Sequence, residues 1–433
     1  MNIAREESPH SPPDTGTAGG RLDTRAGGGY AWVTSRIEIP HDLYPTLVSI
    51  WRSGAGGRRK TTAGGTAQRS LSREEMLGVA PRVKELSHGF TRERTLAGER
   101  YLSRPDLLGA YLLHFWPISY AQARLCLEMM QRAREGASIT SALDVGAGPG
   151  AFSLALLDAG VPNVTACDRS SAALALARRI AAERGHSLRT REWDATKTTG
   201  IPEGRFDVIA LGHTLNELWA GHADRISLRV SFLQRLASSL QPGGRFLIVE
   251  PALMKTAQEA IMVRDGLARA RFVVEMPCIW QSNCPALPEG TCHGEFDWTP
   301  VPDMERLAHA ARIGRETLRM AWFVLRRPQG TAAVLTPAVT AASLDSSPDG
   351  GLYRVVSEPL LSKSGRIRYL VCGPIGRFAL SARKDCPGAG VKPFFALKRG
   401  DLIVLTGCVK RESGWGLEES SRVEVRESPP RIG

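Results

Sequence analysis

Acidic residues and glycines between positions 141 and 168 have the types and spacing best suited to cofactor chemistry. An apolar run from 141 to 145 contains Asp144 and breaks at once into a glycine-rich turn before a helical stretch. The glycines of this turn are Gly146, Gly148 and Gly150. Glycine lets a backbone turn tightly and approach a ligand, and the N-terminus of the next helix is partly positive. The next apolar run ends in Asp168, at the distance where a carboxylate binds both ribose hydroxyls. The pattern predicts a nucleotide-cofactor site.

Two classes of cofactor fit a turn of this kind. The letters G-x-G-x-x-A from position 146 satisfy a relaxed dinucleotide fingerprint. The acid before the turn, the third glycine and a further acid in Glu-Trp-Asp194 together resemble class I S-adenosylmethionine-dependent methyltransferases. In that family the turn lies beside the methionine part of the cofactor, so the resemblance implies that Asp168 binds the ribose and Asp194 lies at the adenine. The alternative for each acid is a helix cap or a solvated loop residue.

Three cysteines stand close together in a polar, turn-rich stretch. They are Cys278, Cys284 and Cys292, at intervals of six and eight residues. An intracellular chain is not expected to form a disulfide framework, so the spacing indicates a metal site. Zinc ribbons bring their ligands in Cys-x2-Cys pairs, which are absent here, whereas wider loops suit an iron–sulfur cluster with four thiolates. The candidates for a fourth ligand are Cys372, Cys386, Cys408 and His293.

A second resemblance rests on four segments. They are Cys-Ile-Trp-Gln-Ser-Asn-Cys-Pro from 278 with a later Cys-His, Leu-Arg-Arg-Pro from 325, Leu-Val-Cys-Gly-Pro-Ile-Gly from 370, and Ser-Ala-Arg-Lys from 381. Together they are similar to the methyltransferase-like family associated with the small ribosomal subunit, which includes mitochondrial assembly factors and bacterial homologues. The resemblance implies the small ribosomal subunit and its rRNA as partners. It also implies a four-iron, four-sulfur cluster whose ligands are Cys278, Cys284, Cys292 and Cys372.

The turn after the strand-like run 206–211 is the candidate site of methyl transfer. It lacks the Asn/Asp-Pro-Pro-aromatic motif with which many base-modifying methyltransferases orient an exocyclic amine, and no Pro-Cys nucleophile lies near it. His213, Asn216 and Glu217 are the candidate catalytic residues, as a proton acceptor and as hydrogen-bonding groups for a substrate. The alternative is that Asn216 and Glu217 only pack near the cofactor.

Three functions therefore remain open. The first is a methyltransferase that acts on small-subunit rRNA. The second is a non-catalytic ribosome assembly factor that uses S-adenosylmethionine and the cluster as structural or sensing ligands. The third is a small-molecule methyltransferase with an unrelated zinc site.

Alternating strands and helices must position these residues. Strand-like runs at 141–145, 163–167, 206–211 and 244–250 alternate with helix-like runs at 150–158, 170–184, 224–239 and 254–269. The alternation predicts an α/β fold, a doubly wound Rossmann-like domain. Before it, Ser72 and Glu75 form a predicted capping box, and Leu107 to Ala133 are predicted as helices interrupted at Pro117. After it, short β-rich runs predict a small OB-like module.

The predicted organisation has four parts. They are a disordered tail (1–36), a mostly helical region (37–135), the methyltransferase domain (136–330) with a cysteine-rich insertion (277–293), and the β-rich module (335–425).

The charge of the chain indicates a polyanionic partner. The 433 residues carry a formal net charge of +12. Residues 354–412 hold 12 Lys or Arg against 4 Asp or Glu, and residues 52–104 hold 12 against 5. Nucleic acid is the leading candidate for the partner, although either stretch also fits a solvated face or a structural cap. No apolar run reaches the roughly 18 residues of a membrane span. We expect a cytoplasmic, monomeric protein without membrane contact.

Overall fold

The computed structural model describes residues 36–54, 70–91, 104–133, 138–197, 199–288, 290–314, 317–327, 347–362 and 365–432. Residues Thr34–Gly433 form one compact unit. The predicted tail, apart from Arg36, lies outside the described residues. In the basic stretch 52–104, residues 55–69 and 92–103 also lie outside them.

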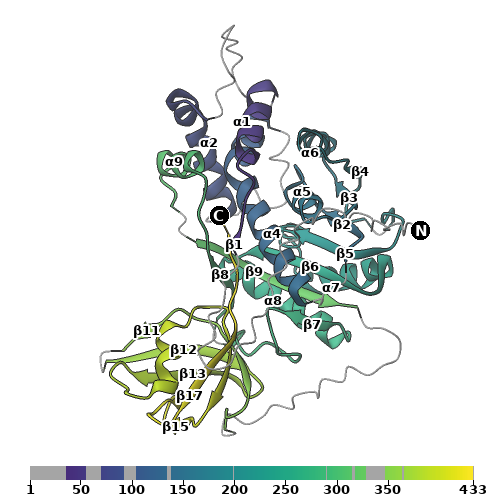
Figure 1. Ribbon diagram of the computed structural model, residues 1–433. Helices are drawn as coiled ribbons and strands as arrows, with labels where there is room; N and C mark the ends of the chain where they lie inside the picture. The colour runs from purple at the N-terminus through teal and green to yellow at the C-terminus, as the bar shows by residue number, and fades with distance from the viewer. Residues whose placement is uncertain are drawn as a thin grey trace, which may run out of the picture. The chain divides into compact units, whose positions relative to one another are not determined.

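A mixed β-sheet forms the centre of the methyltransferase-type domain (Figure 1). Its order is β4-β3-β2-β5-β6-β9-β7, with β8 paired to β9 outside this path. The strands are β2 (Ser141–Val145), β3 (Asn163–Asp168), β4 (Arg189–Glu192), β5 (Phe206–Gly212), β6 (Leu240–Pro251), β7 (Val273–Met276), β8 (Gly294–Asp297) and β9 (Thr317–Arg326). β2 to β6 are parallel, and β9 is antiparallel to its neighbours. The chain winds outward in opposite directions from β2 and β5, and doubly wound sheets bind ligands at such a switch point. The predicted α/β fold is confirmed.

Helices cover both faces of this sheet. They are α5 (Ala151–Asp158), α6 (Ser171–Glu183), α7 (Arg225–Leu236), the 3₁₀ turn η3 (Ala237–Ser239) and α8 (Met254–Arg269), whereas α9 (Pro302–Ala310) packs against helices of the N-terminal region (Figure 1). On β5, Val208 and Ala210 belong to the apolar core that contains α5 and α6, whereas Ile209 and Leu211 belong to the core that contains α7 and α8. A strand covered on both faces is apolar at every position, which explains why such strands stand out in the sequence.

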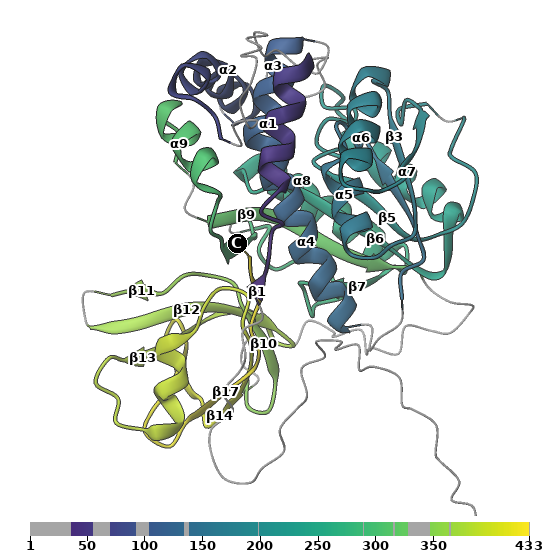
Figure 2. The ribbon, with the colours of Figure 1, turned by 45° about the horizontal axis from the view of Figure 1, so that its top comes forward.

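Helices from the N-terminal region pack beside this domain (Figure 2). They are α1 (Leu43–Gly54), α2 (Arg73–Thr91), α3 (Pro105–Ala110), the π-helical turn η2 (Tyr111–Phe115) and α4 (Trp116–Ala133). The capping box is confirmed, because Ser72 N–H donates to Glu75 Oε2 at 2.8 Å and Glu75 N–H donates to Ser72 Oγ at 3.1 Å. The predicted interruption at Pro117 is displaced: the irregular turn is η2, which comes directly before α4, and Pro117 is the second residue of α4. No described helix has the length and apolar character needed to span a membrane.

The C-terminal module is an eight-stranded sheet with its own apolar core, and its strands curl around that core (Figure 2). Its order is β15-β16-β13-β12-β10-β14-β17, with β11 beside β12. The elements are β10 (Leu352–Val355), β11 (Leu360–Leu361), β12 (Arg366–Gly373), β13 (Gly376–Arg383), the 3₁₀ helix η4 (Ala389–Ala396), β14 (Leu402–Thr406), β15 (Val409–Arg411), β16 (Gly414–Gly416) and β17 (Arg422–Glu427). The two ends of the described chain meet, since β1 (Arg36–Ile37) pairs in parallel with β18 (Arg431–Ile432).

Candidate functional site

A cavity of about 1420 Å³ lies at the carboxyl ends of β2, β3 and β5. Most of the residues predicted to bind the cofactor line it: Asp144, Gly146, Gly148, Asp168 and Asp194. All three predicted catalytic residues line it as well: His213, Asn216 and Glu217. The sheet therefore brings the two predicted sets together at its switch point. Gly150 is not among the lining residues.

The glycine turn is shaped by close contacts. Gly146 has a φ of +68°, and a Cβ at this position would lie 2.5 Å from the side chain of Thr214. Gly150 has a φ of +80°, and its Cβ would lie 2.7 Å from the Cβ of Ala177 on α6. Both positions require glycine for backbone and for space. Gly150 therefore lets α5 and α6 pack, and in this structure it shapes the turn from outside the cavity.

Two carboxylates stand on either side of this turn. Asp144 is buried and accepts a hydrogen bond from Ser153 Oγ at 2.6 Å, and burial raises its pKa to about 7. Asp168 accepts the N–H of Gly148 at 2.9 Å on Oδ2 and the N–H of Ser170 at 2.8 Å on Oδ1. A carboxylate has about four acceptor positions. Asp168 is therefore oriented by the turn and retains acceptor positions for a ligand.

Trp193 and Asp194 form another wall of the cavity. The indole Nε1 of Trp193 donates to the carbonyl of Thr199 at 3.1 Å, which fixes the ring. Asp194 accepts the backbone N–H of Thr196 at 3.0 Å and its hydroxyl at 2.7 Å. Burial alone would raise the pKa of Asp194, but these hydrogen bonds hold it below its ordinary value. The wall thus offers a flat ring beside a charged acceptor.

The turn after β5 is held by its own side chains. His213 has a φ of +60°, and its Nε2 lies 2.8 Å from Gln122 Oε1, an amide oxygen that only accepts. Asn216 Nδ2 donates to the carbonyl of His213 at 2.7 Å. Behind the turn, Arg229 donates to the carbonyls of Asn216 at 3.1 Å and Leu218 at 3.0 Å. His213 and Asn216 therefore contribute to the shape of the turn as well as to the cavity wall.

Sequence reasoning missed the wall supplied by the N-terminal helices. Its lining residues include Phe90, Tyr111, Phe115, Ser119 and Gln122. Trp116 of α4 donates from Nε1 to the carbonyl of Pro149 at 2.9 Å and so ties this wall to the glycine turn. An amphipathic helix shows which residues it buries but not which neighbour it packs against, so the sequence offered no signal for this wall.

The four cysteines predicted as metal ligands lie in one electrostatic neighbourhood. Burial raises the pKa of Cys284 to about 12 and that of Cys292 to about 11, and it raises the pKa values of Cys278 and Cys372. The other three thiols raise the pKa of Cys372 further, although it belongs to the C-terminal module. Cys408 instead donates its backbone N–H to Asp349 at 2.9 Å. Among the described residues, no group of three or more His, Cys, Asp or Glu side chains has the geometry to hold a metal ion.

Four arginines lie near these thiols, and two of them are buried: Arg264 is 1% exposed and Arg354 is 9% exposed. Burial raises the pKa values of Cys278 and Cys292, and the arginines oppose this rise, Arg264 and Arg354 at Cys278 and Arg377 and Arg399 at Cys292. Arg264 donates to the carbonyls of Trp280 and Ser282 and forms a buried ion pair with Asp265 at 2.6 Å, whereas its buried Nε has no hydrogen-bond partner. The thiols therefore lie beside guanidinium groups that are largely shielded from water.

Comparison with known proteins agrees with this geometry. The family described as mitochondrial small ribosomal subunit Rsm22 matches residues 107–377. A methyltransferase from Pyrococcus furiosus is 16% identical and has a TM-score of 0.32 over 47% of this chain and 83% of its own. A ribosomal protein L11 methylase from Lactobacillus delbrueckii subsp. bulgaricus is 17% identical and has a TM-score of 0.28 over 47% and 78%. No curated protein matches. With TM-scores this low, the fold assignment rests on the strand order and the glycine turn.

Proposed function

Because the chain belongs to the family described as mitochondrial small ribosomal subunit Rsm22, we propose that it is an S-adenosylmethionine-binding, methyltransferase-like protein that associates with the small ribosomal subunit. The observation that carries the proposal is the cavity at the β2–β5 switch point, lined by the glycine turn and by Asp144, Asp168 and Asp194.

In this proposal each wall of the cavity binds one part of S-adenosylmethionine. Asp168 accepts the ribose hydroxyls, since its oxygens are oriented by the turn and keep acceptor positions. Trp193 and Asp194 lie at the adenine, where a ring face and a hydrogen-bond acceptor suit a purine with an exocyclic amine. The methionine part lies along Gly146 and Gly148. Asp144 supports the turn through Ser153.

We further propose that Cys278, Cys284, Cys292 and Cys372 hold a four-iron, four-sulfur cluster. Four thiolates around such a cluster carry net negative charge, which the buried guanidinium group of Arg354 would partly balance, together with Arg264, whose charge is shared with Asp265. A cluster spans a larger polyhedron than one ion. The wide spacing of the thiols in the sequence therefore favours a cluster over zinc. Such a cluster would join the C-terminal module to the methyltransferase domain.

The partner follows from the family and from charge. Lys and Arg outnumber Asp and Glu by 12 to 4 in residues 354–412, so the C-terminal module is the proposed contact with rRNA phosphates. Binding through such contacts weakens steeply with salt. We propose a monomer that acts in the compartment of its ribosome, the cytoplasm.

Methyl transfer to rRNA is the first of two candidate activities at this cavity, with His213, Asn216 and Glu217 as its catalytic residues. A second candidate, assembly without transfer, is favoured by one observation: Asn216 and His213 hold the turn through their own hydrogen bonds. Glu217→Gln separates the two, because it removes a charge from the cavity and keeps the shape. If transfer occurs, this variant should lose most methylation of small-subunit rRNA while its affinity for S-adenosylmethionine stays within about threefold; if not, rRNA modification should be unchanged.

The proposed function is tested first on protein purified without oxygen. Iron, sulfide and zinc are assayed on the same sample, binding of S-adenosylmethionine is measured by calorimetry, and association with small subunits is followed by sedimentation. About four irons per chain, with cofactor binding and co-sedimentation, would support the proposal. A colourless protein with one zinc would refute the cluster, and the absence of cofactor heat would refute the cofactor site. Cys372→Ser, compared with Cys408→Ser as its matched control, should lose iron selectively.

A further inference from the structure

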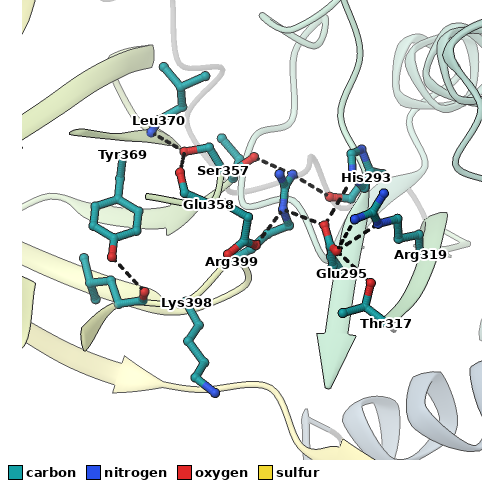
Figure 3. A network of polar contacts seen from close by, with 12 residues as sticks. His293, Glu295, Thr317, Arg319, Ser357, Glu358, Tyr369, Leu370, Lys398 and Arg399 are labelled. Atoms are coloured by element: carbon teal, nitrogen blue, oxygen red, sulfur yellow. Dashed lines mark hydrogen bonds and ion pairs between the residues drawn. The ribbon is translucent and has the colours of Figure 1, made fainter. Parts of the chain in front are cut away.

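A polar network links the cysteine-rich insertion, the C-terminal module and the wall of the cofactor cavity (Figure 3). Its centre is Glu295 on β8, three residues after Cys292. On β9, Thr317 Oγ1 donates to Glu295 Oε1 at 2.7 Å and Arg319 Nε donates to the same oxygen at 2.8 Å. The other oxygen of Glu295 lies 3.8 Å from His293 Nε2 and 3.9 Å from Arg399 Nε. One carboxylate therefore contacts β9, Arg399 of the C-terminal module and its own neighbour His293.

Arg399 connects this carboxylate to the C-terminal module. Its Nη1 donates to the carbonyl of Val356 at 2.7 Å and to that of His293 at 3.3 Å, and its Nε donates to Glu358 Oε1 at 3.4 Å. The arginine thus fastens the residue after Cys292 to the module that carries Cys372. A change in the position of Cys292 would therefore move the carbonyl of His293, to which Arg399 donates.

β9 connects the same carboxylate to the cofactor cavity. Thr317 and Arg319, the two residues that Glu295 holds, both line the cavity. The carbonyl of Arg319 accepts a hydrogen bond from Gln122 Nε2 at 3.2 Å, and Gln122 Oε1 in turn bonds His213 Nε2. The contacts form an unbroken path from Cys292 to the turn after β5.

The side chain of Glu295 is largely buried, and its pKa is held below the ordinary value. Its side chain is 11% exposed, and the hydrogen bond from Thr317 is partly buried, whereas that from Arg319 is exposed. Burial alone would raise the pKa of Glu295, but the hydrogen bonds from Thr317 and Arg319 and the charge of Arg399 hold it below its ordinary value. A charged, partly buried acceptor with several donors fixes those donors relative to one another.

We propose that Glu295 is a positioning residue through which the thiol site and the cofactor cavity raise each other's ligand affinity. This inference rests on the proposed cofactor and cluster. A metal group bound to Cys292 would fix β8 in one position, Glu295 would hold β9 in the matching position, and the cavity wall would be ordered before the cofactor arrives. Coupling of this kind is reciprocal in binding free energy.

The test measures S-adenosylmethionine affinity by calorimetry in metal-loaded and chelator-treated protein. The wild-type protein should bind at least about fivefold more tightly when loaded, the lower end of typical coupling. Glu295→Gln should reduce that ratio to below about twofold. The matched control is Glu358→Gln, which removes a carboxylate from Arg399 but has no contact with β9, and it should keep the wild-type ratio. Equal affinities in the two wild-type states, or a control that loses the ratio as fully as Glu295→Gln, would overturn the inference.

A second measurement uses only loaded protein, so that it holds even if the metal-free chain unfolds. An iron chelator is added with and without saturating S-adenosylmethionine, and the loss of visible absorption is timed. The cofactor should slow iron loss severalfold in the wild-type protein and in Glu358→Gln but not in Glu295→Gln. Equal rates in the wild-type protein would overturn the coupling alone. The absence of any cofactor binding to loaded wild-type protein would overturn the proposed function and this inference with it.

Discussion

Replacing Asp168 with Asn should weaken S-adenosylmethionine binding by about 100-fold. The carboxylate is oriented by two backbone donors, Gly148 N–H at 2.9 Å and Ser170 N–H at 2.8 Å. Asn has the same shape but offers one acceptor oxygen and places an NH₂ group where the second oxygen stood. That group would meet either the Gly148 N–H or the Ser170 N–H, so one backbone contact that orients the side chain is lost and one acceptor contact to the cofactor is weakened.

The magnitude follows from hydrogen bonds to a charged acceptor, each of which contributes about 1.5–3 kcal/mol. Two affected contacts at the lower end of this range amount to about 3 kcal/mol. Since about 1.4 kcal/mol corresponds to a tenfold change in affinity, the dissociation constant should rise about 100-fold. Calorimetry on the purified variant measures this change directly.

The matched control is Asp207→Asn. Asp207 also sits on a parallel strand and accepts two backbone N–H groups, those of Thr140 at 2.8 Å and Ser141 at 3.1 Å, but it is not among the residues that line the cavity. This variant should bind S-adenosylmethionine within about twofold of the wild-type protein, because Asp207 does not line the cavity. A folded Asp168→Asn protein, judged by its thermal transition, that binds within threefold of wild type would refute the role of Asp168.

Three further predictions follow from the same contacts. Gly146→Ala should lose about tenfold or more in cofactor affinity, because its φ of +68° and the approach of Thr214 leave no room for a Cβ, whereas Gly160→Ala, with open space at φ +84°, should bind normally in the same titration. Burial raises the pKa of Asp144 to about 7. The folded protein therefore keeps a proton that the unfolded chain releases above about pH 4, so the free energy of unfolding should fall between pH 4 and 7. Urea unfolding of Asp144→Asn should show a smaller fall over that interval, and an unchanged fall would contradict the assignment. Ser72→Ala should lower the free energy of unfolding by about 1 kcal/mol in urea titrations, because it removes one side of the capping box.

Apolar periodicity made much of the domain predictable. Strand 141–145 and helix 254–269 match β2 and α8 to the residue, because each is apolar where it faces a core. β4 was missed because Arg-Thr-Arg-Glu is an edge strand with exposed side chains and no apolar pattern. β6 begins at Leu240, before its predicted start, and its pairing with β5 shifts register there. Local pattern thus predicts buried elements and misses those held only by their neighbours.

The candidate site divides along the same line. Types and spacing selected Asp168 and Asp194, since these positions follow strands whose ends must meet at one edge of the sheet. Residue types and spacing could not show that Asn216 Nδ2 donates to the carbonyl of His213, because this hydrogen bond depends on a turn with a left-handed residue. Nor could they show that Gln122, from a helix 91 residues away in sequence, reaches His213. Contacts of this kind exist only after the helices have packed.

Cys372 was predicted as a metal ligand from the resemblance alone, and the fold shows how its strand is connected to the cysteine-rich insertion. No spacing rule links it to the insertion that contains Cys278. In the structure, Cys372 pairs with Arg354 across β12 and β10, and Arg354 Nε donates to the carbonyl of Pro277 at 3.1 Å, one residue before Cys278. One buried arginine therefore joins the strand of the fourth thiol to the segment of the first. In the proposed cluster the ligand set would be completed by strand register in a separate module. Loss of such a cluster should therefore disturb the contact between the module and the domain before it disturbs the core of either.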